Sequence, residues 1–369
     1  MTTPMNVGIA GAGSIAFATA ALLERNGHAA SLWSPGGTGA AALAHQPLTA
    51  KGAFEGEFRP AILPSAEAVC DNDVVIVAVP GYGHRAVFDA LAPCLQPGTQ
   101  VIISSHASFG ALYLAQALRE RGIELPITCW GTTAVTGRRT GETEVTINTV
   151  RAKIDMCTVP STREGEARTV CNKLFGDVFV PRDGLLAITL SNLNPQNHMG
   201  IALLNMTRME HGEVWSQGAN VTPKVGELLE RLDEERLAIA HALGLKVKTI
   251  FEHFHLSFHV PIASISQMNQ QMHAEGRGGT GPASADSRYV TEDVPYGLLP
   301  IALLGALTDR RATLHEAGIE IFSAMYGRDF RAENTLLAAL DLGAVPLSTL
   351  AEAGRTGRLQ RAPEPIHSP

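Results

Sequence analysis

The sequence predicts an α/β protein in which an N-terminal doubly wound sheet is followed by an all-α C-terminal domain. A glycine-rich turn joins the first strand to the first helix, and apolar runs of strand length recur up to about residue 180. After Arg182 only helical periods remain. We therefore expect a first domain at residues 1–185, a helical domain at 186–359 with a cleft between the two, and a disordered, proline-rich tail at 360–369.

Composition and charge restrict the possible functions. The 369 residues are 45% hydrophobic and 18% charged, and the formal net charge is −7. A negative chain without clusters of Lys or Arg argues against nucleic acid or an acidic membrane surface as a partner. We find no signal peptide and no unbroken apolar stretch of about 18 residues, so we expect no membrane span. Five cysteines without a CxxC pair indicate free thiols and a cytoplasmic protein.

The start of the chain has the order of elements that a Rossmann-type dinucleotide-binding domain requires. A strand at Met5–Ala10 runs into Gly-Ala-Gly-Ser-Ile-Ala, and a helix is expected from about residue 15 to 26. A second strand follows at Ala30–Trp33. Strand, glycine turn, helix and strand together make the motif more specific than two glycines alone.

Each position of the turn has a physical role in holding a dinucleotide. Gly11 permits the tight turn, Gly13 lets the backbone approach a pyrophosphate, and Ala16 lets the helix pack closely on the sheet. The pyrophosphate would bind amide groups at the helix N-terminus, at Ser14 and Ile15.

The second strand ends without the carboxylate that usually binds the ribose hydroxyls of NAD. Residues 32–38 read Leu-Trp-Ser-Pro-Gly-Gly-Thr. Ser34, Thr38 and the amides between them could instead receive the 2′-phosphate of NADP. The missing carboxylate makes us expect NADP. Because no arginine stands in this turn to bind the phosphate, NAD is kept as the alternative.

Further strands and helices complete the predicted first domain. The apolar run after Asp73 is typical of a strand buried on both faces of a parallel sheet. It ends at Pro80, in a loop at the carboxyl end of the strand, which makes Pro80 a candidate cofactor contact. Segments 145–150 and 153–159 are expected to extend the same sheet as a hairpin. Other strands are predicted at 101–105, 127–130 and 177–180, and helices at about 110–121 and 163–175.

In the second domain, one helix carries an unusual set of polar side chains. Pro195 suits the first position of a helix, and Asn194 before it suits the N-cap. With a period of 3.6 residues, Asn194, His198 and Asn205 share one face of a mostly apolar helix. Because histidine exchanges a proton near neutral pH, His198 is a candidate general acid or base. A buried structural histidine would give the same pattern.

A second segment with possible chemistry follows a glycine-rich stretch. Residues 276–287 contain four glycines and a proline, and we expect a mobile loop that could act as a lid. Residues 288–298 then read Arg-Tyr-Val-Thr-Glu-Asp-Val-Pro-Tyr-Gly-Leu. Pro295 predicts a helix that starts just after Asp293. Asp293 could orient an imidazole and Arg288 could bind a carboxylate in bidentate fashion; a helix cap with a surface salt bridge is the alternative.

Three histidines between residues 253 and 259 raise the question of a metal site. His255 and His259 would share a face if the segment were helical. No nearby cysteine or acid completes an obvious ligand set, so we expect structural or substrate-lining roles and no metal.

These motifs resemble the opine dehydrogenase family, of the octopine and nopaline type, over nearly the whole chain. The resemblance lies in Asn192-x-Asn194-Pro195-x-x-His198 with Asn205, in Arg288-Tyr289-x-x-Glu292-Asp293-x-Pro295-Tyr296-Gly297, and in Tyr326-Gly327-x-Asp329-Phe330. The family usually has a threonine–proline pair upstream of the last motif. Here the segment reads Ala312-Thr313-Leu314 and lacks the proline. Because this segment helps to shape the substrate site in members of the family, the departure bears on which substrate this chain binds.

The resemblance implies an NAD(P)H-dependent reductive coupling of an amino acid with a 2-oxo acid to a secondary amine dicarboxylate. It implies a helical domain of the 6-phosphogluconate dehydrogenase C-terminal type, with His198 as general acid/base paired with Asp293. Arg288 would hold the oxo-acid carboxylate, and Asn194 and Asn205 would orient the substrate or the cofactor amide. A ketopantoate-type or other 2-oxo acid reductase that needs no amine is one alternative, and a cofactor-binding sensor without chemistry is another. Apolar faces in the helical domain make a homodimer reasonable.

Overall fold

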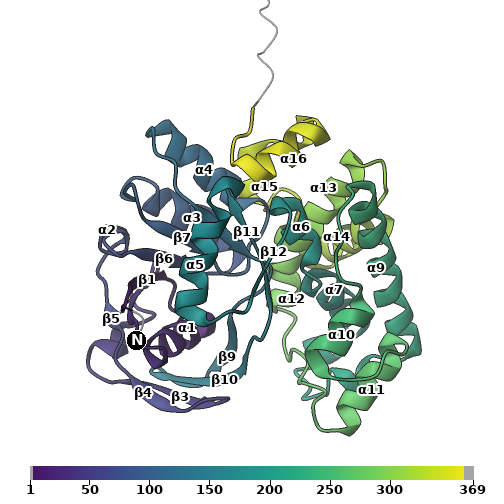
Figure 1. Ribbon diagram of the computed structural model, residues 1–369. Helices are drawn as coiled ribbons and strands as arrows, with labels where there is room; N and C mark the ends of the chain where they lie inside the picture. The colour runs from purple at the N-terminus through teal and green to yellow at the C-terminus, as the bar shows by residue number, and fades with distance from the viewer. Residues whose placement is uncertain (1–2, 361–369) are drawn as a thin grey trace, which may run out of the picture. The chain divides into compact units, whose positions relative to one another are not determined.

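The computed structural model describes residues 3–360, which form two compact units (Figure 1). The first unit comprises Met1–Ile188 with Ala339–Pro369, and the second comprises Thr189–Ala338. The chain passes from the first unit to the second after Ile188, close to the domain boundary that we expected at residue 185. The second boundary differs from the prediction: we assigned residues 339–359 to the helical domain, but they belong to the first unit. The predicted tail, apart from Gln360, lies outside the described residues.

The C-terminal helix α16 (Leu347–Thr356) belongs to the first unit because its buried face packs there. A Cβ added at Gly354 would lie 3.0 Å from Leu186 Cδ1, so the helix approaches this neighbour closely. Arg355 pairs with Asp183 at 2.6 Å. The helical period of this segment is visible in the sequence, but a period identifies a buried face and not the core that receives it.

The first unit contains an eight-stranded sheet in the order β12-β11-β8-β7-β6-β1-β2-β5. Neighbours from β8 to β5 run parallel, β11 runs antiparallel to β8, and β12 runs parallel to β11. The chain moves outward from β1 on one side and returns on its other side, so the strand order reverses next to β1, where doubly wound sheets bind ligands. The strands are β1 (Asn6–Ala10), β2 (Ala29–Trp33), β5 (Ala61–Ile62), β6 (Val74–Val77), β7 (Gln100–Ile103), β8 (Ile127–Trp130), β11 (Ile154–Val159) and β12 (Phe179–Pro181).

The first unit also has a second sheet, in the order β4-β3-β10-β9. The prediction that segments 145–150 and 153–159 form a hairpin is wrong, because β10 pairs with β9 and β3, whereas β11 pairs with β8. Both segments have strand-like patterns, and such patterns do not specify the partner strand. The strands are β3 (Leu48–Gly52), β4 (Gly56–Phe58), β9 (Val135–Arg139) and β10 (Glu144–Val150).

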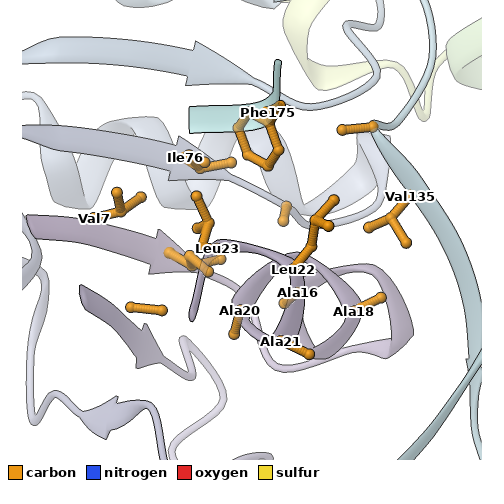
Figure 2. Packing of buried hydrophobic residues seen from close by; sticks show 14 of the residues in the cluster. Val7, Ala16, Ala18, Ala20, Ala21, Leu22, Leu23, Ile76, Val135 and Phe175 are labelled. Carbon is orange, nitrogen blue, oxygen red and sulfur yellow. The ribbon is translucent and has the colours of Figure 1, made fainter. Parts of the chain in front are cut away.

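Helix α1 (Ser14–Arg25) contacts strands of both sheets (Figure 1). All its residues from Ala16 to Leu23 are buried, as expected of a helix that is covered on more than one face. Figure 2 shows Leu23 of this helix in the same cluster as Val7 of β1 and Ile76 of β6. This packing fixes the start of α1 and the glycine-rich turn before it. The other helices that follow strands here are α2 (Ala66–Cys70), α3 (Gly81–Leu91), α4 (Gly110–Glu120) and α5 (Glu164–Phe175).

The second unit is helical, as predicted. Its described residues contain no strand, only an isolated bridge between Ser216 and Thr280. Its fully buried side chains include Leu229, Leu232 and Phe322. The helices are α6 (Gly184–Ser191), which enters from the first unit, α7 (Asn194–Leu204), α8 (Met206–Glu210), α9 (Pro223–Ala242), α10 (Ile250–Phe258), α11 (Ile265–Ala274), α12 (Arg288–Thr291), α13 (Leu299–Leu307), α14 (Thr313–Tyr326) and α15 (Thr335–Leu340), which returns to it.

One long helical run, Arg288–Leu307, joins α12 to α13 through a π-helical turn at Val294–Leu298. As predicted, a helical element starts just after Asp293, which is its N-cap, and Pro295 lies in its first turn. This element is a π-helical turn, and it continues a run that already begins at Arg288. Asn334 Nδ2 donates to the Pro295 carbonyl at 2.7 Å. By length and composition alone this run could cross a membrane. However, 56% of its apolar 18-residue window is buried, and core helices of other proteins pass the same test.

Candidate active site

The structure brings His198 and Asp293 together, although 95 residues separate them in the sequence. His198 Nδ1 lies 2.7 Å from Asp293 Oδ2, and the two side chains are 22% and 18% exposed. A carboxylate bonded to Nδ1 fixes the orientation of the imidazole ring. Nε2 is then the nitrogen that can exchange a proton with a bound molecule.

The start of α7 sets the position of His198. The helix begins at Asn194, as the proline indicates, but Leu193 occupies the N-cap position and no side chain caps it. The predicted cap is therefore wrong by one residue: Asn192 Oδ1 instead accepts a hydrogen bond from the Asn194 N–H at 3.1 Å.

A close contact joins α7 to the helical run that carries Asp293. A Cβ added at Gly297 would lie 2.3 Å from Pro195 Cγ. Only glycine allows this approach, and the approach holds the histidine helix and the aspartate helix at hydrogen-bonding separation. This explains why a glycine stands in the π turn just after the aspartate.

Tyr289 covers the imidazole ring of His198. The two ring centroids are 3.6 Å apart and the ring planes differ by 10°. Burial, with the negative charge of Asp293, raises the pKa of Tyr289 to about 12, so its hydroxyl stays protonated. The hydroxyl donates to Gln217 Oε1 at 2.8 Å. Tyr289 had no predicted role of its own, although its i, i+4 spacing from Asp293 places both residues on one helical face.

The glycine-rich stretch 276–287 is a loop, as expected, and it packs on the segment that carries Gln217. Gly281 N–H donates to the Trp215 carbonyl at 3.0 Å, and Trp215 Nε1 donates to the Pro282 carbonyl at 3.0 Å. A Cβ at Gly281 would lie 2.2 Å from the Trp215 ring. The glycines therefore serve close packing, and the loop is connected to Tyr289 through this segment.

A buried ionic network lies two residues before His198. Gln196 Nε2 donates to Asp233 Oδ1 at 2.9 Å, and Arg236 Nη2 donates to the same oxygen at 2.7 Å. Asp233 Oδ2 accepts from the Ile250 N–H at 2.8 Å. The side chains of Arg236 and Asp233 are 0% and 2% exposed, so this network ties the histidine helix to α9 inside the core.

The three predicted substrate-binding residues lie in different surroundings. Arg288 is exposed, and its Nη1 is 3.4 Å from Glu292 Oε2. Asn194 is exposed one turn before His198. Asn205 is buried at the end of α7, where its Nδ2 donates to the Ile201 carbonyl at 3.0 Å. The amide group of Asn205 is thus bonded to its own helix.

The glycine-rich turn fits a dinucleotide pyrophosphate. Gly11 has φ +145°, and an added Cβ there would lie 2.4 Å from the Ala78 carbonyl oxygen. A Cβ at Gly13 would meet nothing within 4 Å, so the backbone is open to a ligand at that point. Helix α1 begins at Ser14 with no side-chain cap and no acid in its first turn. Its first amide groups are therefore suited to an anion.

The other predicted cofactor residues surround this turn or lie at strand ends. Ile15 is partly buried and Ala16 is buried. Ser34 Oγ accepts from the Gly39 N–H at 3.1 Å. Pro80 is the N-cap of α3, so the loop that we expected after β6 is shorter, and the helix begins at Gly81.

The histidines at 253–259 do not share the geometry that we considered for a metal site. His259 follows the end of α10 in a left-handed conformation, so it does not continue the face of His255. His255 Nδ1 donates to the Val260 carbonyl at 2.8 Å. Between residues 3 and 360, no group of three His, Cys, Asp or Glu residues has a metal-binding arrangement.

Comparison with known proteins gives the family. Residues 181–326 match the model of the NAD/NADP octopine/nopaline dehydrogenase alpha-helical domain, and residues 7–152 match that of ketopantoate reductase PanE/ApbA. An opine dehydrogenase of Arthrobacter sp. (strain 1C) is 31% identical over 290 residues, which cover 78% of this chain and 80% of that protein. The chain belongs to the opine dehydrogenase family.

Solved structures share the fold of this opine dehydrogenase. An octopine dehydrogenase structure with NADH and L-arginine is 17% identical with a TM-score of 0.77, over 97% of this chain and 99% of that one. A yersinopine dehydrogenase structure with NADP+ is 16% identical with a TM-score of 0.69, over 91% and 98% of the two chains. These likenesses support a Rossmann-type unit with a helical unit.

Family membership gives the reaction class. The chain is an NAD(P)-dependent oxidoreductase that acts on a CH–NH bond, and its reaction is the reductive condensation of an amino acid with a 2-oxo acid. The ketopantoate reductase match lies within the first unit, whereas the helical unit carries the octopine dehydrogenase match. The comparisons therefore do not favour the reductase without amine or the sensor.

Proposed function

We propose that His198 is the general acid/base of this opine dehydrogenase, that Asp293 orients it, and that Arg288 binds the carboxylate of the 2-oxo acid. The hydrogen bond of 2.7 Å between His198 Nδ1 and Asp293 Oδ2 carries the proposal. A carboxylate in this position selects the tautomer with a proton on Nδ1 and stabilises the imidazolium that forms during proton transfer. The ring of Tyr289 stacked on the imidazole restricts its rotation.

The condensation needs proton transfers that one histidine can perform. Nε2 of His198 takes a proton from the ammonium group of the amino acid, and the free amine then attacks the keto carbon. The same nitrogen returns the proton to the carbinolamine hydroxyl, which leaves as water. Loss of water leaves an iminium ion, and the nicotinamide cofactor, when bound, supplies the hydride that reduces this ion to the secondary amine. Asn194, one turn before His198, and Asn205 are proposed to orient the substrate.

The reaction is tested by following NADPH and NADH oxidation with a panel of 2-oxo acids, each with and without a pool of amino acids. We expect oxidation that requires both substrates. Equal rates with and without the amino acids would contradict the proposal and indicate a hydroxy-acid-forming reductase. Cofactor binding without oxidation on any pair would indicate a sensor.

Lysine in place of Arg288 is expected to raise the apparent KM for the 2-oxo acid by about tenfold and to change kcat less. An ammonium group cannot reproduce the bidentate contact of a guanidinium with a carboxylate. Steady-state kinetics with the oxo acid varied at saturating amino acid measure this. Arg331→Lys is the matched control, because Arg331 is another exposed arginine that pairs with an acid, Glu320, at 2.8 Å. An Arg288→Lys variant whose KM matches that of Arg331→Lys would refute the contact.

We further infer NADP as the preferred cofactor, a cytoplasmic location and a homodimer. The turn after β2 lacks an acid, which favours NADP over NAD.

All five cysteines are free, and four of them are buried, which suits a reducing compartment. Exposed apolar side chains of the helical unit, Leu204, Ile321 and Met325, suit a contact between copies. Sedimentation velocity tests the dimer, and a species of monomer mass would refute it.

A further inference from the structure

An arginine of the second sheet lies at the glycine-rich turn. Arg139 is the last residue of β9, and its backbone N–H donates to Ser14 Oγ at 2.9 Å. Its Nη1 donates to the Ala12 carbonyl at 3.1 Å and to the Gly39 carbonyl at 2.8 Å. The side chain therefore joins the glycine-rich turn to the loop after β2, which is the loop in which the sequence has no arginine.

The positive charge of Arg139 is held in place without being neutralised. Its Nε donates to the Gly141 carbonyl at 2.9 Å, and Nη2 donates to the Glu142 carbonyl at 2.8 Å. The guanidinium carbon lies 4.5 Å from the centre of the Phe17 ring. Among residues 3–360, no carboxylate lies within 4.0 Å of this guanidinium. A fixed, half-buried cation whose bonds go to neutral carbonyl groups attracts an anion.

The loop after β2 brings a hydroxyl to the same place. Ser34 Oγ accepts from the Gly39 N–H, so its own hydrogen can still donate to an anion. A Cβ added at Gly39 would lie 2.9 Å from both Ala12 Cβ and Ser34 Oγ, so the loop folds tightly on the glycine-rich turn. In dinucleotide-binding sheets this is the region of the adenosine ribose, where an acid binds the 2′-hydroxyl of NAD and an arginine accommodates the 2′-phosphate of NADP.

We propose that Arg139 determines the cofactor specificity of this enzyme by supplying the cation for the ribose 2′-phosphate of NADP. The proposal rests on the NADP preference inferred above. The second sheet thus contributes the charge that the turn after β2 lacks, from a position about a hundred residues further along the chain. The same side chain also braces the two loops, and the test must separate these two effects.

Calorimetric titration with 2′,5′-ADP and 5′-ADP makes this separation, because the two nucleotides differ only in the 2′-phosphate and support no turnover. The full-length enzyme is expected to bind 2′,5′-ADP at least about tenfold more tightly than 5′-ADP, because one charge-assisted hydrogen bond raises affinity by about that factor. Arg139→Gln is expected to lose most of this preference while its affinity for 5′-ADP changes less. Arg138→Gln is the matched control on the same strand, because Arg138 is exposed, and it should keep the preference.

Each outcome decides one of the two proposals. Equal affinities in the parent enzyme would refute the NADP preference and the role of Arg139 with it. If the preference of the parent enzyme for 2′,5′-ADP persisted in Arg139→Gln, the NADP preference would be supported and the role of Arg139 would be overturned. If Arg139→Gln lost affinity for both nucleotides by the same factor, Arg139 would only hold the two loops together, and the proposal would also be overturned. If Arg139→Gln does not fold, Arg139→Lys, which keeps the charge, must retain part of the preference for the proposal to stand.

Discussion

Alanine in place of His198 is expected to lower turnover by about a hundredfold or more and to leave dinucleotide affinity unchanged. A methyl group can neither take the ammonium proton of the amino acid nor protonate the leaving hydroxyl. The glycine-rich turn, which we propose to hold the cofactor, belongs to the other unit, so we expect dinucleotide affinity to be independent of the imidazole. Cofactor oxidation measures kcat, and the change in NADPH fluorescence on binding measures Kd. Turnover within about tenfold of the parent would contradict the assignment.

Two further variants make the test specific. His211 is also near a carboxylate, with its Nδ1 4.0 Å from Glu213 Oε1, but its side chain is 75% exposed. His211→Ala should therefore keep full turnover. Asp293→Asn should lose activity by way of the histidine, so the double variant should be no slower than His198→Ala alone. Fully additive losses would show that Asp293 acts independently of His198.

Methionine in place of Arg236 is expected to lower the free energy of unfolding by about 3 to 5 kcal/mol. The change leaves Asp233 buried without its counter-charge, and it removes the donors to the Leu190 and Lys248 carbonyl groups. Burial lowers the pKa of Arg236, while the charge of Asp233 opposes that effect. Urea unfolding followed by far-UV circular dichroism measures the loss.

The same helix offers a matched control for this prediction. Arg231 of α9 pairs with Glu234 at 2.8 Å, and both side chains are about 60% exposed. Arg231→Met should lower the free energy of unfolding far less than Arg236→Met, because water already screens an exposed pair. If the two variants lost equal stability, the buried network would contribute no more than a surface ion pair.

The sequence predicts the features whose signals are local. The glycine-rich turn, the buried strand beginning at Val74 and the proline that opens the histidine helix each depend on neighbouring residues, and the structure has each of them. His198 and Asp293 could be named because each stands in a short motif. Their hydrogen bond could not be derived, because it depends on the packing of Pro195 against Gly297.

The features that sequence reasoning missed depend on pairing between distant segments. The second sheet unites β3 with β10, and neither strand pattern identifies its partner. Arg139 reaches the glycine-rich turn only through that sheet, so no motif near the turn indicates it. The position of Tyr289 could have been predicted, because its i, i+4 spacing from Asp293 places both on one helical face, next to the histidine.

The return of the last described residues to the first unit makes the helical unit an insertion. The described residues before Thr189 and from Ala339 to Gln360 belong to the first unit, and the helical residues Thr189–Ala338 lie between them in the sequence. A fragment cut at the first junction would lose α16 and uncover Leu185 and Leu186, which are buried. The first unit therefore needs both of its chain segments to complete its core, and the helical unit is joined to it at two junctions instead of one.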